Sequence, residues 1–240
     1  MHFFDLVPHM IPSLHPWNVS AEEAVKIQKQ LKSQVRIKAL RSEIHTIAGA
    51  DISFNRGSDI LYAGIILLDY HTLRPKAHSL VRTEAQFPYV PGLLSFREVP
   101  ALLQAWEQLE LVPDVIMLDG HGIAHPRRMG VATHFGLWVS KPSLGCAKKL
   151  LTGLHESLEN EAPSSSIIYD KKDQLGYALR SRAHVKPVYI SPGHLLDHQG
   201  ALSISRHCLT GYRITEPTRL AHQLVNRFRK GEVQSGFSRY

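Results

Sequence analysis

Apolar and polar residues alternate along the first half of the chain in a pattern that predicts three strands. Between residues 47 and 54, alanine, isoleucine and phenylalanine alternate with small or polar residues, which is the two-residue period of a strand. Residues 60–69 are apolar on both faces, so they predict a strand inside a sheet. Turn residues separate the two segments, and residues 76–82 predict a third strand. We therefore expect an antiparallel three-strand meander.

A helix is predicted before the first strand. Ser20 and Glu23 have the spacing of a capping box, in which each side chain caps the other's backbone N–H. Ile27, Leu31 and Val35 then follow four residues apart, which places them on one helical face.

The second half of the chain mixes helical and strand patterns. Apolar residues repeat at helical spacing over residues 99–109 and again over 220–228. Residues 115–118 predict a short buried strand, and residues 143–147 predict another. Residues 159–166, with one proline and three serines, predict a polar loop.

The order of these elements predicts the α/β class, with a central mixed sheet that opens with the meander and is flanked by helices. A chain of 240 residues, 43% of them hydrophobic, is long enough for one large core. We expect an N-terminal extension over residues 1–17, a single domain over 18–230 and a loosely held C-terminal tail over 231–240.

Composition narrows the class of protein. Lysine and arginine outnumber the acids by 28 to 21, an excess that suits a polyanionic partner without establishing one. Cys146 and Cys208 have no C-x-x-C spacing, and the proline-broken start of the chain lacks the features of a signal peptide. No apolar stretch approaches the ~20 residues of a membrane helix. We expect a cytoplasmic monomer without membrane contact.

Three acids occupy positions where a charge is costly. Asp51 interrupts an apolar strand, Asp119 closes another, and Glu98 lies on the core-facing stripe of the helix that follows. His222 borders the apolar stripe of the last helix. Turn or helix caps are the alternative for the acids, and a structural role is the alternative for His222. Together the four residues suit Mg²⁺, for which Mn²⁺ is expected to substitute, and hence phosphodiester cleavage.

The segment after Asp119 offers groups for an anion. His121 and His125 are four residues apart, but the neighbouring glycines and proline argue against the helix that an H-x-x-x-H zinc pair needs. We expect His125, Arg127 and Arg128 to contact phosphate instead, together with Lys148, for which a solvated side chain is the alternative.

The motifs resemble the endonuclease V family. The resemblance extends over roughly residues 20–228 and rests on six segments, 48–51, 88–98, 119–128, 145–149, 193–194 and 216–219. It implies a ribonuclease H-like fold with Asp51, Glu98, Asp119 and His222 as metal ligands and Lys148 as a catalytic side chain. The family carries Asp or His at position 222, so this ligand is the least secure of the four.

Family membership implies cleavage of the second phosphodiester bond 3′ to inosine, leaving 3′-hydroxyl and 5′-phosphate ends. Bacterial members act chiefly in DNA repair and animal members favour RNA, so DNA and RNA containing inosine both stay open as partners. A related ribonuclease H-like nuclease, such as a junction resolvase, is one rival. A non-catalytic nucleic-acid-binding module is another, although it needs no inward-facing carboxylates.

Two further features bear on base recognition. Pro88, Tyr89, Val90 and Pro91 are expected to form a rigid wedge, because the two prolines restrict the backbone around an exposed aromatic ring. Packing of Tyr89 on the protein is the alternative. The wedge would support extrusion of a base into a pocket whose expected lining residues are Gly92, Leu94, Ser95, Gly120, Gly130 and Val131.

Overall fold

The fold was analysed in a computed structural model that describes residues 13–240. The strands are β1 (Thr46–Phe54), β2 (Ile60–Asp69), β3 (Pro75–Glu84), β4 (Val115–Leu118), β5 (Ser143–Ala147), β6 (Ser164–Asp170), β7 (Asp173–Arg180), β8 (Val188–Pro192) and β9 (Gly236–Arg239). The helices are α1 (Ala21–Leu31), α2 (Leu94–Glu107), α3 (Val131–Val139), α4 (His198–His207) and α5 (Glu216–Arg229), and a short 3₁₀ turn (Lys32–Gln34) follows α1.

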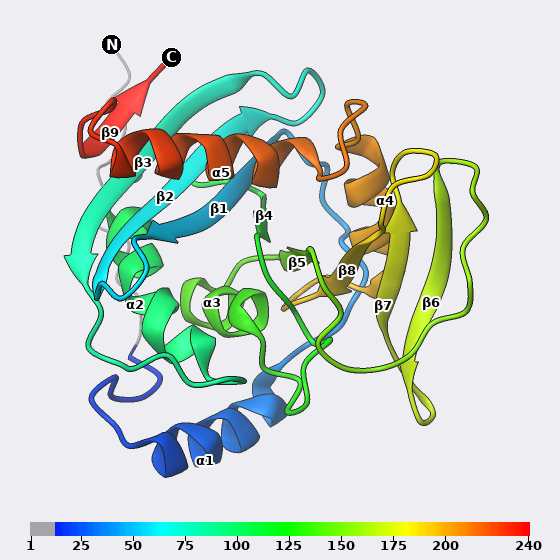
Figure 1. The fold of residues 1–240 in the computed structure, drawn as a ribbon, viewed down its shortest axis with the longest axis horizontal. Coiled ribbons are helices and arrows are strands. Elements are labelled where there is room, and N and C mark those ends of the chain that lie inside the picture. Colours follow the sequence, from blue (N-terminus) through cyan, green and yellow to red (C-terminus); the bar gives the residue numbers. More distant parts are fainter. Residues whose placement is uncertain (1–12) are drawn as a thin grey trace.

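Within these residues the nine strands form one mixed sheet in the order β6-β7-β8-β5-β4-β1-β2-β3-β9 (Figure 1). The strands β1, β2 and β3 pair antiparallel, which confirms the meander. The strands β4 and β5 extend the sheet in parallel from β1, so the carboxyl ends of β1, β4 and β5 point the same way. Side chains that follow these ends are thereby brought together.

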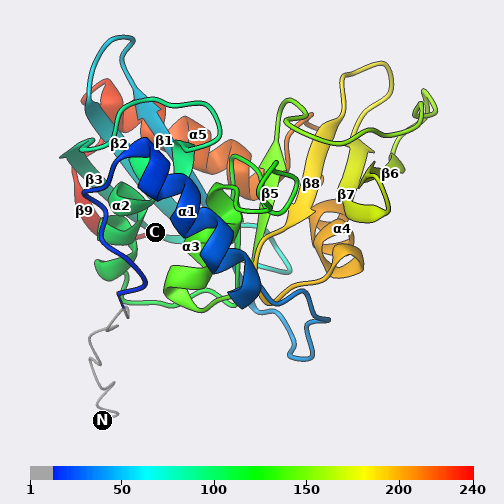
Figure 2. The same cartoon turned by 90° about the horizontal axis from the view of Figure 1, so that it is seen from below.

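Alternation along β1 divides the core into two layers. Ala48 and Ala50 face α2 and α3, while Ile47 faces α4 and α5 on the other side of the sheet. Figure 1 shows α5 crossing β1 and β2, and Figure 2 shows α1 lying across α2 and α3 on the opposite side. The capping box of Ser20 and Glu23 at the start of α1 is present as expected.

Helix α5 packs unusually close to β1. A Cβ atom at Gly49 would lie 2.0 Å from the backbone oxygen of Pro217, so only glycine allows this approach. Pro217 lies at the start of α5, where a missing N–H costs nothing. The close contact brings the next turn of α5, which carries His222, over β1.

The prediction of a loop over residues 159–166 is wrong for residues 164–166, because β6 begins at Ser164 and pairs with β7. The error has a physical cause. Strand β6 is an edge strand in which only Ile168 is buried, and it begins with three consecutive serines, so its sequence shows no alternation of apolar and polar residues.

The two chain ends also differ from expectation. Residues 236–239 form β9 and pair with β3, Leu80 opposite Gly236 and Ala77 opposite Arg239, so the tail is not loosely held there. Of the expected N-terminal extension, residues 13–17 are described and His15 is buried, while the rest lies outside the described residues.

The two cysteines are buried and unpaired. Burial raises the pKa of the Cys208 thiol to about 12, and it raises the pKa of Cys146 as well. Both therefore behave as small apolar core residues. In the described part of the chain, no helix is long and apolar enough to cross a membrane.

Candidate active site

Parallel pairing of β1 and β4 brings two carboxylates together. Ala50 lies opposite Leu118, and the next residue on each strand is the acid, Asp51 or Asp119. The N–H of Asp119 donates to the backbone oxygen of Ala50 at 3.0 Å, which fixes this register. The side chains of Asp51, Asp119 and His222 offer ligand atoms that all lie within 4.8 Å of one another.

Each carboxylate has a cationic or hydrogen-bonding partner. The Nδ1 atom of His222 donates to Oδ2 of Asp51 at 2.8 Å, and the N–H of Ile52 donates to Oδ1 at 2.7 Å. The Lys148 ammonium forms an ion pair with Asp119. Lys148 follows β5, the neighbour of β4 in the sheet, so strand order explains this contact as well.

The third acid, Glu98, lies in α2 and does not belong to this group of ligand atoms, but the charges of Asp51 and Asp119 act on it. Burial, followed by the negative charges of Asp51 and Asp119, raises its pKa to about 8. Burial also raises the pKa of Asp51, with Asp119 adding to the effect, whereas the hydrogen bond to Asp51 raises the pKa of His222. Three mutually repelling carboxyl groups beside one imidazole form a site that a divalent cation would stabilise, and their hard oxygen donors fit Mg²⁺.

A pocket of about 220 Å³ adjoins the carboxylates. Gly120 and Ser95 lie in its wall, the first directly after Asp119 and the second one helical turn before Glu98. All six residues expected in a base pocket line it. The complete lining is Tyr89, Val90, Pro91, Gly92, Leu94, Ser95, Gly120, His121, His125, Met129, Gly130, Val131 and Leu151.

The first turn of α2 contributes backbone donors to the pocket. No side chain caps this helix, and Leu94 and Ser95 in its first turn line the cavity. The initial N–H groups of a helix have no partner within the helix and carry a partial positive charge. They can therefore donate hydrogen bonds to an oxygen atom of a bound base.

Two glycines in the pocket wall allow close packing within the protein. A Cβ atom at Gly120 would lie 2.4 Å from a methyl carbon of Val131, and one at Gly130 would lie 2.3 Å from the backbone oxygen of His121. These glycines let the segment that contains Gly120 and His121 pack closely against the segment that contains Gly130 and Val131. Gly92 has a positive φ of 78°, which favours glycine for backbone reasons.

His125 and Arg127 support the pocket from behind. His125 Nε2 and Arg127 Nη2 donate to the backbone oxygen of Gly92 at 3.0 and 2.6 Å. The other ring nitrogen of His125 accepts from the N–H of Arg127 at 3.1 Å. Burial lowers the pKa of His125 to about 4, so the ring is neutral. We therefore interpret His125 as a pocket support, which differs from the expected phosphate contact.

Arg128 is likewise occupied. Its Nη2 atom contacts Asp170 at 2.8 Å and Asp173 at 3.2 Å, linking the loop to the β6–β7 hairpin. The zinc alternative finds no support in the ring contacts, because His121 donates to the backbone oxygen of Lys149 at 2.9 Å while His125 donates to Gly92.

Tyr89 projects from the loop between β3 and α2, and 66% of it is exposed. Val90 and Pro91 beside it line the pocket, whereas Pro88 does not belong to the lining. The side chain is thus mostly exposed, as the wedge interpretation requires, and the rest of it lines the pocket.

A family model for endonuclease V matches residues 29–223, which is most of the chain. The chain belongs to the endonuclease V family. It is 44% identical over 225 residues to endonuclease V of Myxococcus xanthus (strain DK1622), covering 93% of this chain and 96% of that protein. A crystal structure of endonuclease V from Streptomyces avermitilis is similar with a TM-score of 0.84 and 35% identity, covering 90% of this chain and 95% of that one.

The fold is shared with a distant member. An endonuclease V variant from Ciona intestinalis, crystallised with a 23mer DNA containing an inosine followed by a ribo-adenosine, has a TM-score of 0.80 at 23% identity, covering 89% of this chain and 99% of that one. Endonuclease V structures have the ribonuclease H-like fold, so the expected fold is confirmed. Endonuclease activity on nucleic acid follows from the family.

Sequence patterns did not point to Gln28, Leu151 and Asn226, which also belong to the site. Gln28 in α1 donates to the backbone oxygens of Gly92 and Met129, each at 3.2 Å. Its four-residue spacing from buried Ala24 was a signal that it faces inward. Leu151, 46% exposed, lines the pocket from a loop, and Asn226 Nδ2 donates to the backbone oxygen of His222 at 2.8 Å. No sequence pattern marks these two.

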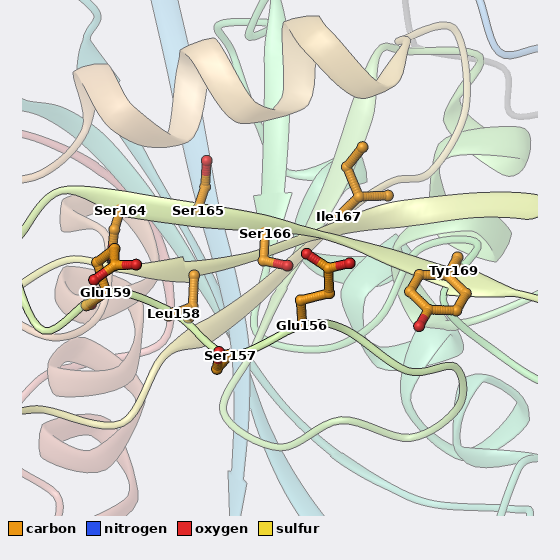
Figure 3. A pocket seen from close by; sticks show the side chains of 9 residues that line it. All are labelled: Glu156, Ser157, Leu158, Glu159, Ser164, Ser165, Ser166, Ile167 and Tyr169. Carbon is orange, nitrogen blue, oxygen red and sulfur yellow. Dashed lines mark hydrogen bonds between the residues drawn. The ribbon is translucent and has the colours of Figure 1, made fainter.

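Another hollow of about 540 Å³ has none of the site carboxylates in its lining (Figure 3). It runs between the segment 156–159 and β6, and its lining includes Glu156, Glu159 and four serines but no basic residue. A hollow with two acidic side chains and no basic side chain would repel a phosphate backbone. The smaller pocket beside Asp119 is therefore the candidate substrate site.

Proposed function

We propose that this protein is a Mg²⁺-dependent endonuclease that recognises inosine in DNA and cuts the second phosphodiester bond on its 3′ side. The observation that carries the proposal is the position of a base-sized pocket directly beside the acid cluster, with Gly120 following Asp119 in its wall. A role in repair of deaminated adenine follows from this substrate. The Ciona intestinalis structure with inosine-containing DNA supports the same substrate class.

Four side chains would hold the metal. Asp51 and Asp119 are the proposed direct ligands, and Glu98 and His222 complete the site. When bound, Mg²⁺ would polarise the phosphoryl oxygen, lower the pKa of a bound water and stabilise the departing 3′ oxygen. Mn²⁺ is expected to substitute, because it accepts the same oxygen ligands.

Side chains of the protein are proposed to position the nucleic-acid strand. The Lys148 ammonium, paired with Asp119, is close enough to the acids to contact a phosphate oxygen once a cation has offset their charge. Cleavage is proposed to leave 3′-hydroxyl and 5′-phosphate ends. Buried carboxylates argue against a module that only binds, since without a cation they would repel phosphate.

We propose that the pocket and the wedge act together in base recognition. A base inside a duplex must leave the stack before its edge can be tested. The exposed Tyr89 ring would fill the vacated space, and the N–H groups of Leu94 and Ser95 would donate to the six-position oxygen of hypoxanthine. Adenine carries an amino group at the six-position. That group is itself a hydrogen-bond donor, so it could not accept from these N–H groups. A junction resolvase would need neither the pocket nor the wedge.

Removing the carboxylates tests the proposal. Asp51→Ala and Asp119→Ala should each abolish cutting of an inosine duplex while binding largely survives, because the metal site and the pocket use different groups. His222→Ala should reduce cutting less. Glu107→Ala, at an exposed acid near the end of α2, is the matched control and should cut as wild type does. Full activity of either aspartate variant would refute the metal site.

A further inference from the structure

The N-terminal segment reaches the base pocket through a chain of buried side chains. His15 Nε2 lies 2.7 Å from His134 Nε2, and His134 Nδ1 lies 3.0 Å from the Ser95 hydroxyl oxygen. His134 is fully buried and His15 nearly so, while Ser95 lines the pocket. Trp17 stacks on Trp138 at 4.9 Å between ring centroids and closes the cluster from outside.

The protonation of His15 follows from its neighbours. Its Nδ1 atom lies 2.9 Å from the backbone oxygen of Pro16, which can only accept, so Nδ1 carries the hydrogen. Trp138 Nε1, which can only donate, points at His15 Nε2 from 3.3 Å. Burial lowers the pKa of His15, so the ring is neutral. Both contacts therefore require Nε2 of His15 to be a bare acceptor.

The protonation of His134 follows from that of His15. With His15 Nε2 bare, the 2.7 Å contact requires His134 Nε2 to donate. Burial holds the pKa of His134 well below its usual value, so this ring is neutral too and its Nδ1 atom is bare. The only hydrogen available for the Nδ1 contact is that of the Ser95 hydroxyl. Ser95 therefore donates to His134.

The Ser95 oxygen is left to act as an acceptor. Gln28 Nε2 approaches it at 3.5 Å, but the two hydrogens of that amide have closer acceptors at 3.2 Å in Gly92 and Met129. With its one hydrogen committed to His134, Ser95 can offer only lone pairs to a ligand in the pocket.

We propose that His15 and His134 are positioning residues that fix the Ser95 hydroxyl as a hydrogen-bond acceptor, so that the pocket selects bases carrying a hydrogen on N1. This inference rests on the proposed function and names a further determinant of its specificity. Hypoxanthine has an N1–H that can donate to Ser95. Adenine and unsubstituted purine present a lone pair at N1, which an acceptor repels. The backbone N–H groups of α2 test the six-position, and Ser95 tests N1.

The first test measures the wild-type protein directly. In ¹⁵N-histidine-labelled protein, the nitrogen chemical shifts of His134, assigned with His134→Gln, should identify the tautomer with hydrogen on Nε2. His15 should show hydrogen on Nδ1. A doubly protonated His134, or hydrogen on its Nδ1 atom, would overturn the proposal. The tautomers are read from the wild-type protein, and the variant serves only to assign the resonances.

The second test compares binding of two single-stranded DNAs in EDTA, one with inosine and one with purine deoxyriboside at the same position. Ser95→Ala and His15→Leu should each weaken binding to the inosine strand about tenfold, the effect of one hydrogen bond. Neither should weaken binding to the purine strand. His15→Gln keeps an acceptor toward His134 and should largely restore the preference. Trp17→Phe alters the packing of the same segment and should leave the preference unchanged.

The outcomes separate the two proposals. A third strand with adenine at the same position tests the proposed function, which would be refuted by a wild-type protein that binds the inosine strand no better than the adenine strand. A wild-type preference that persists in Ser95→Ala and His15→Leu would refute only the role of Ser95. An equal loss on both strands would indicate a structural effect of the cluster and would also overturn the inference.

Discussion

The Glu98 carboxyl group is electrostatically costly where it lies, and it is also a proposed metal ligand. It is half-buried on α2, one helical turn before the buried Leu102, where a hydrophobic residue would pack at no electrostatic cost. Burial and the charges of Asp51 and Asp119 raise its pKa to about 8 from an ordinary 4.5. The proposed cation would offset the charge of a carboxyl group at such a position.

The pKa of Glu98 predicts how stability depends on pH without metal. Because its folded pKa lies above the unfolded value, its favourable contribution is complete below pH 4.5 and is lost as the pH rises through 8. Glu98→Gln imitates the protonated form. In EDTA above pH 8 it should therefore raise the free energy of unfolding by on the order of 2–4 kcal/mol.

Denaturant unfolding at pH 5 and pH 8.5 would check this prediction. The variant and wild type should be similar at pH 5, and Mg²⁺ should remove most of the difference at pH 8.5 by stabilising wild type. Parallel stability curves for the two proteins across this range would contradict the assigned pKa.

At the scale of elements, the loop that carries Tyr89 is the feature most directly tied to duplex DNA. The prolines on either side restrict its backbone, so little conformational entropy remains to be lost on insertion. The ring is exposed, and its neighbours Val90 and Pro91 line the pocket. This arrangement places an aromatic surface where an extruded base would leave a gap.

Tyr89→Ala should weaken binding to an inosine duplex by ~1–3 kcal/mol, the usual contribution of stacking on one base. The effect should be smaller on single-stranded DNA, which has no stack to open. Titration of both substrates in EDTA would measure it. Tyr169→Ala, at an exposed tyrosine on β6, is the matched control. Wild-type affinity of Tyr89→Ala for the duplex would mean that the loop only connects β3 to α2.

Over the whole molecule, sequence patterns predicted the elements that carry the acids. The strands β2, β4 and β5 begin and end at the expected residues, because buried strands have a continuous apolar signal. The strands β6, β7, β8 and β9 were not predicted, nor were the helices α3 and α4. The edge strands β6 and β9 have few buried side chains, and β8 joins the sheet by pairing with β5 and β7, so its place depends on other segments of the chain. The end of the sheet beyond β5 and the last strand β9 are therefore the parts of this fold that the sequence conceals.

The candidate site was predicted in its acids and in its pocket, and less well in its supports. Asp51 and Asp119 follow strands whose periods are evident. The contacts of His125 and Arg128 depend on which loop lies behind the pocket, which no local pattern encodes. Likewise, the burial of His15 against His134 joins positions 119 residues apart. Such contacts emerge only from the assembled fold.

Cleavage mapping tests the central claim most directly. Wild-type protein should be incubated with end-labelled duplexes that differ only in carrying inosine or adenine at one position, in Mg²⁺ and in EDTA. We predict one cut, at the second phosphodiester bond 3′ to inosine, with 3′-hydroxyl and 5′-phosphate ends, and no product from adenine or in EDTA. Equal cutting beside adenine, or undiminished cutting in EDTA, would contradict the account.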